Sequence, residues 1–237
     1  MSAPDSPWTR ERSRVRQSRE DKRESVLHAA AIAFAQRGVD GTSMEELAAS
    51  LGVTKPTIYR TVGDKDAIVR ACEARMVSGF RDALAQAKAV RGTGLEKIAH
   101  YLRASLHMMV HDPYCRLNLP LGGPDMYSGS SQDSRSMREE AQAQVRAWLR
   151  ADLRAGTLRP DVDARLTALA LFAAFNFIPR WYRPDGPQSL DEIFDATMRV
   201  FERGLARVPL DAVSVPATAG AAAKRAPRRR IEAPAPR

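Results

Sequence analysis

Residues 42–66 read TSMEELAASLGVTKPTIYRTVGDKD, and they carry the signals for two short helices separated by a glycine turn. Ser43 followed by Glu46 is typical of a capping box, in which each side chain hydrogen-bonds a backbone N–H at a helix start. The apolar residues recur at helical spacing, as expected of one buried face: Met44, Leu47, Ala48 and Leu51. Gly52 can adopt the left-handed backbone that ends a helix, so we expect the first helix to stop just before it.

A second short helix is expected from Thr54, whose hydroxyl can cap it, with Pro56 in a first turn whose N–H groups lack intrahelical partners anyway. Ile58 and Val62 are its expected inward residues. The remaining side chains have little reason to be buried: Thr54, Lys55, Thr57, Tyr59, Arg60 and Thr61. Two short helices around a glycine turn describe a helix-turn-helix, whose second helix enters the DNA major groove. The same pattern also fits a helical hairpin with a solvated polar face.

This stretch resembles the DNA-binding domain of the tetracycline-repressor (TetR) family of bacterial one-component regulators. The family pattern has a threonine opening the second helix, an alanine before a Gly-Val turn, a Leu-Tyr pair and an aromatic in the recognition helix, and a lysine starting the fourth helix. The corresponding residues here are Thr42, Ala48, Gly52-Val53, Ile58-Tyr59, Val62 and Lys65. Val62 departs from the usual phenylalanine but remains apolar. The resemblance extends over residues 19–207, strong in the first quarter and diffuse afterwards.

The resemblance implies that Thr42, Tyr59 and Lys65 contact DNA phosphates, which position a protein without specifying sequence. Lys55, Thr57 and Arg60 are expected to include the residues that read bases. The full predicted DNA-binding set is Thr42, Ser43, Thr54, Lys55, Thr57, Tyr59, Arg60 and Lys65.

Helical periodicity without convincing strands predicts an all-α chain in four parts. Residues 1–18 are expected to form a disordered basic arm and residues 19–66 the helix-turn-helix domain. Residues 67–208 are expected to form a helical ligand-binding and dimerisation domain, and residues 209–237 a disordered basic tail rich in Ala, Pro and Arg. The net charge of +9 is concentrated in the arm and the tail, which can bind phosphate or simply solubilise the protein.

The composition excludes several classes of protein. Two cysteines, Cys72 and Cys115, do not make a disulfide framework, and reduced thiols suit a cytoplasmic protein. No signal peptide is visible, and the most apolar run, residues 166–179, is too short to span a membrane. No nucleophile elbow, phosphate-binding glycine loop or HExxH motif is present, so we do not expect an enzyme. The predicted location is the cytoplasm, in association with the nucleoid.

Residues 163–180 form an expected helix that is apolar nearly all round, so it must be covered on more than one side. A second subunit would supply the additional cover, and the alternative is a helix buried within one protomer. The resemblance points to the dimer, because TetR-like proteins form a four-helix bundle from their last two long helices. The predicted dimerisation residues are Leu169, Phe172, Phe175, Phe194 and Phe201.

A small-molecule site is expected where helices rich in Met, Phe and Leu surround residues 122–134, a Gly/Ser/Asp-rich loop predicted to be mobile. The candidate ligand-binding residues are Tyr101, His107, Met108, His111 and Phe175. His107 and His111, with Cys115 as a third ligand, are the alternative of a metal site. We favour no metal and no cofactor, because Pro113 interrupts the helical geometry before Cys115.

These predictions combine into a homodimeric transcriptional regulator, a repressor released from a palindromic operator in double-stranded DNA by a lipophilic small molecule. The expected effector is a lipophilic acid, an acyl thioester or a sterol-like molecule, with His107 or Tyr101 as polar anchor. TetR-like proteins let such a ligand tilt the fourth helix and change the separation of the two recognition helices. The alternatives are a constitutive architectural DNA-binding protein, which needs no pocket, and a metal-sensing regulator.

Overall fold

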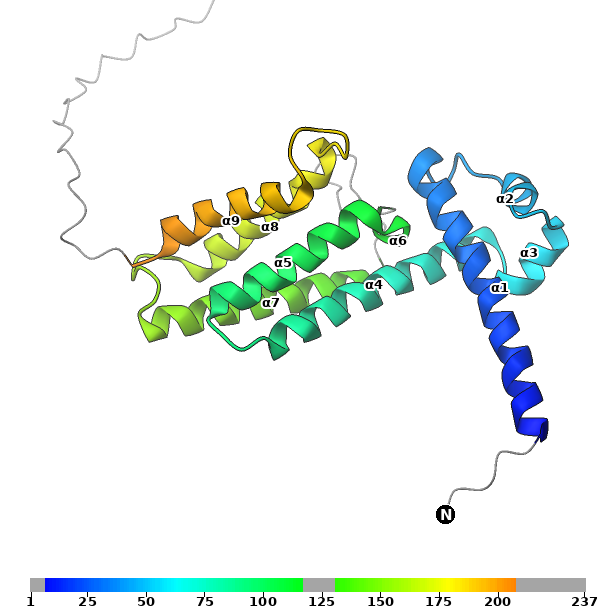
Figure 1. Ribbon diagram of the computed structural model, residues 1–237, viewed down its shortest axis with the longest axis horizontal. Coiled ribbons are helices and arrows are strands. Elements are labelled where there is room, and N and C mark those ends of the chain that lie inside the picture. The colour runs from blue at the N-terminus through cyan, green and yellow to red at the C-terminus, as the bar shows by residue number, and fades with distance from the viewer. Residues whose placement is uncertain (1–6, 117–130, 208–237) are drawn as a thin grey trace, which may run out of the picture. The chain divides into compact units, whose positions relative to one another are not determined.

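The structure is a computed structural model that describes residues 7–116 and 131–207, with side chains from residue 18 onward. Within these ranges the chain is helical (Figure 1). The helices are α1 (Pro7–Arg37), α2 (Met44–Ser50), α3 (Lys55–Val62), α4 (Lys65–Ala89), α5 (Gly94–His111), α6 (Pro113–Arg116), α7 (Gln132–Ala155), α8 (Ala164–Trp181) and α9 (Leu190–Leu205). The predicted all-α class is confirmed. No helix in the described ranges is long and apolar enough to cross a membrane.

Helix α1 begins earlier than the sequence led us to expect, at Pro7 instead of Arg19. Residues 7–18 of the predicted disordered arm are therefore helical. Proline suits the first helical position because its missing N–H would have had no intrahelical partner. No glycine or second proline interrupts the sequence from there to Arg37. Residues 1–6 of the predicted arm, residues 117–130 and the predicted tail lie outside the described residues.

The first hydrophobic cluster holds the helix-turn-helix against α1 and the start of α4. Its members include Leu47, Ile58 and Val62, the inward residues predicted for α2 and α3. They pack with residues of α1 and α4: Leu27, Ala30, Phe34, Ile68 and Cys72. Burying each large apolar side chain contributes roughly 1.5–3 kcal/mol, so this cluster fixes α3 relative to α1. Burial also raises the pKa of the Cys72 thiol to about 12, as expected of an unreactive core cysteine.

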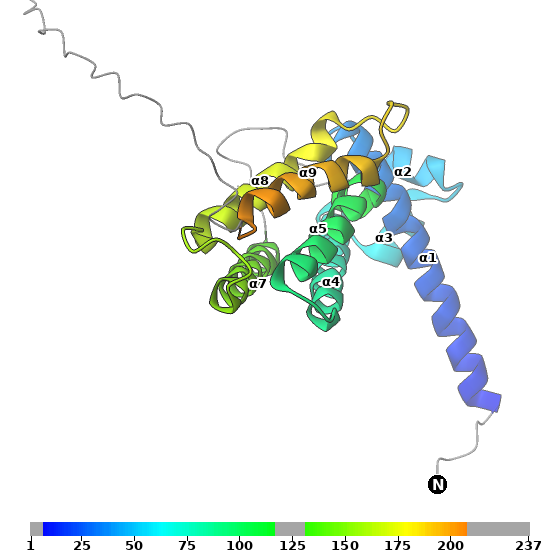
Figure 2. The same cartoon turned by 60° about the vertical axis from the view of Figure 1, so that its left-hand side comes forward.

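The second hydrophobic cluster joins the end of α4 to α5, α7, α8 and α9. Helix α5 packs against all four of these helices, and Figures 1 and 2 show it running alongside α4 and α9. Helix α4 contributes Ile68 and Met76 to the first cluster and Ala83 and Leu84 to the second. A movement of α4 in one hydrophobic cluster therefore also moves side chains in the other cluster.

Helix ends follow the expected local signals. Asp64 and Asp163 each cap the helix that follows by accepting backbone N–H groups, and Gly156 ends α7 with a left-handed backbone at φ 72°. The loop predicted over residues 122–134 is shorter than expected, because Ser131 caps α7 and residues 132–134 are its first turn. Residues 122–130 of that loop lie outside the described part of the chain.

Candidate DNA interface and ligand-binding region

The predicted capping box at the start of α2 is present. The Ser43 hydroxyl accepts a hydrogen bond from the Glu46 N–H at 3.1 Å, and the Ser43 N–H donates to the Glu46 carboxylate at 3.1 Å. Gly52 has a φ of 64°, the left-handed conformation that the turn requires. Ile58 of α3 is fully buried against the first hydrophobic cluster, so the opposite face of α3 is turned to solvent in a fixed orientation.

The start of α3 differs in detail from the prediction. Thr54 occupies the cap position, but its hydroxyl makes no capping hydrogen bond. The N–H that it would have accepted, on Thr57, already donates to the Thr54 carbonyl at 2.9 Å. The two hydroxyls instead lie 2.9 Å apart and hydrogen-bond each other. This pairing leaves two adjacent polar side chains at the start of α3.

The predicted cations of this region have different surroundings. Lys55 forms an ion pair with Glu45 of α2, and its Nζ lies 6.0 Å from the centroid of the exposed Tyr59 ring. Arg60 is exposed and has no ion-pair partner among the described residues. Lys65 is half-buried at the first position of α4. Sequence patterns did not identify Glu45, because its partner is ten residues away, beyond the spacing of neighbours on one helix.

Thr42 is a correction to the predicted DNA-binding set. Its side chain is only 2% exposed, and its hydroxyl donates to the Gly38 carbonyl at 3.0 Å. Its backbone N–H donates to the Val39 carbonyl at 3.2 Å. Thr42 therefore fastens the connection between α1 and α2, and its hydroxyl is not offered to phosphate. The other predicted residues all reach the surface at least in part.

The predicted ligand-binding residues do not converge on one site. Tyr101 is buried and meets the half-buried Phe172 of α8 edge to face, with 6.3 Å between ring centroids. Ser105, one turn further along α5, is also buried. Met108 lies where the two hydrophobic clusters meet. The interior between α5 and α8 is thus apolar with two hydroxyls.

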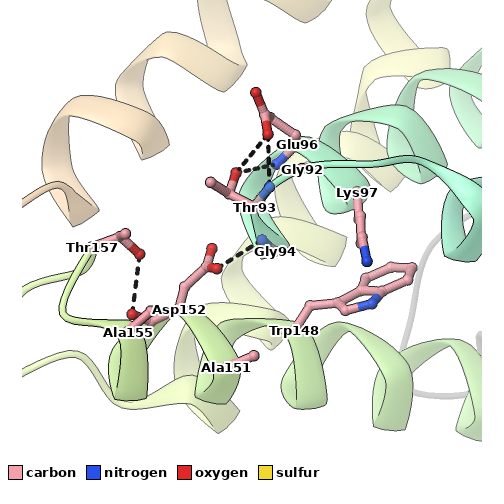
Figure 3. A pocket seen from close by; sticks show the side chains of 10 residues that line it. All are labelled: Gly92, Thr93, Gly94, Glu96, Lys97, Trp148, Ala151, Asp152, Ala155 and Thr157. Carbon is pink, nitrogen blue, oxygen red and sulfur yellow. Dashed lines mark hydrogen bonds between the residues drawn. The ribbon is translucent and has the colours of Figure 1, made fainter.

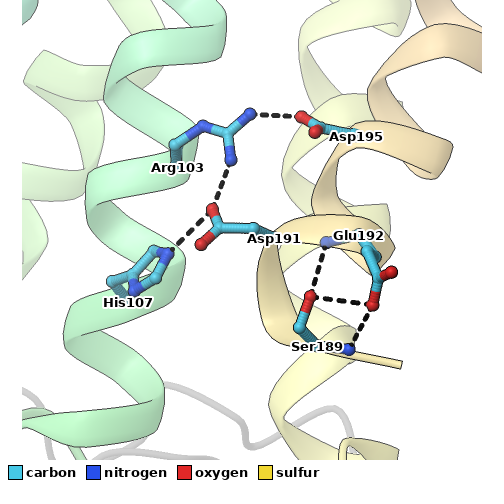
Figure 4. Close-up of polar contacts among 6 residues, drawn as sticks. All are labelled: Arg103, His107, Ser189, Asp191, Glu192 and Asp195. Atoms are coloured by element: carbon cyan, nitrogen blue, oxygen red, sulfur yellow. Dashed lines mark hydrogen bonds and ion pairs between the residues drawn. The ribbon is translucent and has the colours of Figure 1, made fainter. Parts of the chain in front are cut away.

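His107 faces α9 instead of this interior (Figure 4). Its Nε2 lies 3.2 Å from an Asp191 carboxylate oxygen, and Arg103 forms ion pairs with both Asp191 and Asp195. Hydrogen bonds from His107 and Arg103 hold the pKa of the Asp191 carboxyl below its usual value. His111 is exposed. This cluster fastens α5 to the start of α9, so the expectation of His107 as an effector anchor is corrected.

The alternative metal site required His107, His111 and Cys115 to lie together, but their surroundings differ. Cys115 is buried in the first hydrophobic cluster, and burial raises its pKa to about 12. His107, in contrast, pairs with Asp191 on α9. Among the described residues, no group of three or more His, Cys, Asp or Glu side chains is placed to hold a metal ion.

Phe175 and Phe194 are corrections to the predicted dimer surface. Both are essentially unexposed, and their rings pack against each other at a tilt of 42°, with centroids 4.9 Å apart inside the protomer. Phe175, which was also predicted to bind the ligand, is a core residue of the second hydrophobic cluster. Leu169 is exposed in the protomer, whereas Phe172 and Phe201 are half-buried. The large apolar side chains exposed on α8 and α9 are Leu166, Leu169, Phe177, Trp181 and Val200.

A pocket of about 440 Å³ opens between the start of α5 and the end of α7 (Figure 3). Asp152 lies at its base and accepts hydrogen bonds from the N–H groups of Gly94 and Leu95, at 2.7 and 2.8 Å. The protein's own carboxylate thus occupies the helix N-terminus, where an anion would otherwise bind. None of the predicted ligand-binding residues lines this pocket.

A polar joint, which sequence patterns did not predict, connects α6 to the DNA-binding unit. The buried Tyr114 hydroxyl donates to the Glu24 carboxylate of α1 at 2.8 Å, and Arg75 of α4 forms an ion pair with the same carboxylate. Burial, followed by the neighbouring Glu24, raises the pKa of Tyr114. Helices α1, α4 and α6 therefore meet at one carboxylate beside the first hydrophobic cluster.

Comparison with known proteins identifies similar sequences over both halves of the chain. Residues 26–72 match the family described as "Bacterial regulatory proteins, tetR family", and residues 127–205 match "Tetracyclin repressor-like, C-terminal domain". The HTH-type transcriptional repressor KstR2 of Rhodococcus jostii (strain RHA1) is 24% identical over 195 residues, which cover 78% of this chain and 91% of the relative.

Two solved structures extend the comparison to the fold. SCO3833, a TetR-family regulator from Streptomyces coelicolor A3, is 30% identical with a TM-score of 0.58, covering 77% of this chain and 91% of that protein. AibR, solved in complex with isovaleryl coenzyme A and operator DNA, is 19% identical with a TM-score of 0.65, covering 75% and 96%. The likeness to AibR shows a shared fold.

Proposed function

The chain belongs to the TetR family of bacterial transcriptional regulators, and from this premise we propose a homodimeric repressor that a lipophilic small molecule releases from a palindromic operator. The observation that carries the proposal is the outward face of α3, where Lys55, Tyr59 and Arg60 are exposed. On the opposite face, buried Ile58 packs in the core and fixes the orientation of the helix. Cations and hydroxyls on a rigid helix are the chemistry that contacts phosphates and base edges. Operator binding would keep the protein with the nucleoid in the cytoplasm.

The dimer is supported by the exposed side of α8 and α9. Leu166, Leu169, Phe177 and Trp181 recur at helical spacing along α8 and are 43–58% exposed in the single protomer. Contiguous apolar side chains in this number mark an interaction surface. A second copy related by a two-fold axis would cover the stripe and place two α3 helices on one duplex, which requires a palindromic operator.

The effector is best accommodated between α5 and α8, around Tyr101 and Ser105. An apolar interior with two hydroxyls suits a lipophilic molecule that carries a polar group. The chain shares its fold with AibR, which has been solved with isovaleryl coenzyme A, and this likeness supports an acyl thioester as the first class to test. Helix α4 and the Tyr114–Glu24 hydrogen bond provide the physical connection to the DNA-binding unit.

Titration calorimetry tests this proposal. An operator is first selected from random duplexes with the full-length protein, and acyl coenzyme A thioesters are then titrated into free and operator-bound protein. By linkage, an inducer must bind the free protein more tightly than the operator complex, by the factor with which it weakens operator binding. Equal affinity in the two states would contradict the assignment of that thioester as an inducer. Failure to select any operator would contradict DNA recognition itself.

A further inference from the structure

Glu45 lies on the exposed surface of α2 and forms an ion pair with Lys55 at the start of α3. The two side chains are 64% and 43% exposed, respectively. Exposed ion pairs contribute little to stability, because water screens the attraction and two long side chains lose rotamer freedom. The helix-turn-helix is already held together by buried Leu47 and Ile58. A carboxylate in the first turn of α2 also interacts favourably with the helix dipole, but this contribution does not require a partner on α3. Stability therefore does not account for the ion pair with Lys55.

The ion pair neutralises the charge of Lys55 locally, whereas it leaves the charge of Arg60 unchanged. The ammonium of Lys55 lies beside the Glu45 carboxylate and 6.0 Å from the centroid of the Tyr59 ring, within reach of a weak cation–π interaction. The Lys55 hydrogen bond lowers the pKa of Glu45, and the same bond raises the pKa of Lys55, so both are charged at neutral pH. Arg60 has no such partner within the described part of the chain.

We propose that Glu45 is a specificity-determining residue, which keeps Lys55 away from the phosphates of unrelated DNA and presents its ammonium to a base edge of the operator. The inference rests on the proposed DNA-binding function. An unpaired lysine at this place would add a phosphate contact on any sequence, and such contacts raise affinity without discrimination. A carboxylate at the same place also repels phosphate. Glu45 thereby weakens binding to random DNA more than binding to the operator.

The test is the salt dependence of binding by the full-length protein, measured by fluorescence anisotropy. One duplex has random sequence, and the other is the operator selected by the wild-type protein. For Glu45→Gln we expect roughly two- to fivefold tighter binding to the random duplex. Its plot of log affinity against log salt should become steeper by about one, because one more phosphate is neutralised. Operator affinity should change less, so the ratio of the two affinities falls.

Lys55→Met separates this mechanism from a general effect of charge. In the wild-type background it should leave the salt slope on random DNA unchanged and weaken operator binding. In the Glu45→Gln background it should remove the added unit of slope. Glu139→Gln, which removes the same charge from an exposed position on α7, is the matched control and should alter neither duplex.

Three results would overturn the proposal: equal tightening of both duplexes by Glu45→Gln, an unchanged slope in that variant, or a reduced random-DNA slope for Lys55→Met alone. Thermal melting of each variant verifies that the fold is intact, and Lys55→Met provides an independent answer if Glu45→Gln is unstable. A wild-type protein that selects no operator contradicts the proposed function instead, so the two failures are distinguishable.

Discussion

At the scale of single residues, hydrogen bonds within the helix-turn-helix fix which side chains are free to reach DNA. The Ser43–Glu46 capping box and the glycine turn were predicted correctly, because each signal and its partner lie within a few residues. Thr42 matched the family pattern, yet its hydroxyl bonds the Gly38 carbonyl inside the protein. A motif match gives the residue type at a position, but the side chain's partner depends on how the neighbouring loop folds.

Arg60 of α3 and Lys65 of α4 are predicted to have different roles on DNA, Arg60 in reading bases and Lys65 in contacting phosphate. Arg60→Ala should cost about 1–3 kcal/mol of operator binding and relax the preference at particular base pairs, as expected when a base contact is lost. Lys65→Ala should weaken binding to every sequence and flatten the salt slope by about one unit, as expected for a phosphate contact. Binding measured on operator variants at several salt concentrations distinguishes the two. A uniform loss from both substitutions would contradict this division.

At the scale of helices, the contacts between elements decide which face of each helix is internal. Apolar residues surround α8, so periodicity could not show that Phe175 points inward while Phe177 points outward. The start of α1 was missed because arginine-rich sequence fits both a solvated helix and a disordered arm. The Tyr114–Glu24 hydrogen bond joins residues ninety positions apart, beyond any sequence pattern.

The Arg103–His107–Asp191 cluster predicts how acid affects the attachment of α9 to α5. The pKa of Asp191 is lower in the folded protein than in the unfolded chain, first because of His107 and then because of Arg103. Its contribution to stability is therefore complete above the ordinary aspartate pKa of about 3.9 and is lost as pH falls through the lower folded-state value. Asp191→Asn should lower the melting temperature at pH 7 and reduce its further decrease in acid.

Melting curves between pH 7 and pH 2 provide the measurement for this cluster. Asp161→Asn is the control, because Asp161 also forms an exposed ion pair, with Arg159 at 3.3 Å, but does not connect α5 to α9. If the two variants lose the same stability at pH 7 and respond equally to acid, the Asp191 cluster has no special role in holding α9.

At the scale of the whole molecule, α4 belongs to both hydrophobic clusters and links the DNA-binding face to the interior between α5 and α8. At about 1.5 Å per residue its 25 residues span roughly 37 Å, so a small tilt at one end gives a larger displacement at the other. Met108 packs against both clusters, and the Tyr114–Glu24 hydrogen bond ties α6, which follows α5, to α1. A movement of the side chains between α5 and α8 can therefore be transmitted through packed contacts of α4 to α1 and α3.

The exposed stripe of α8 gives the last prediction. Phe177→Glu and Trp181→Glu place a carboxylate on a surface that the partner would cover, and an unpaired charge buried there costs several kcal/mol. We expect folded monomers with a dimer Kd raised at least about a hundredfold, and with operator binding lost because both half-sites must be held together. Phe175→Glu should instead unfold the protomer, since that ring is buried in the core.

Light scattering and circular dichroism together distinguish these outcomes. Ala143→Glu, at an exposed position of α7, is the control for an added surface carboxylate and should remain dimeric. A Phe177→Glu protein that stays dimeric at the same concentration would place the interface elsewhere. If that variant instead unfolds, Phe177→Ala provides the answer, because it keeps the surface uncharged. It should weaken the dimer while leaving the helical signal at room temperature close to that of the wild type, and its melting temperature should depend more strongly on protein concentration.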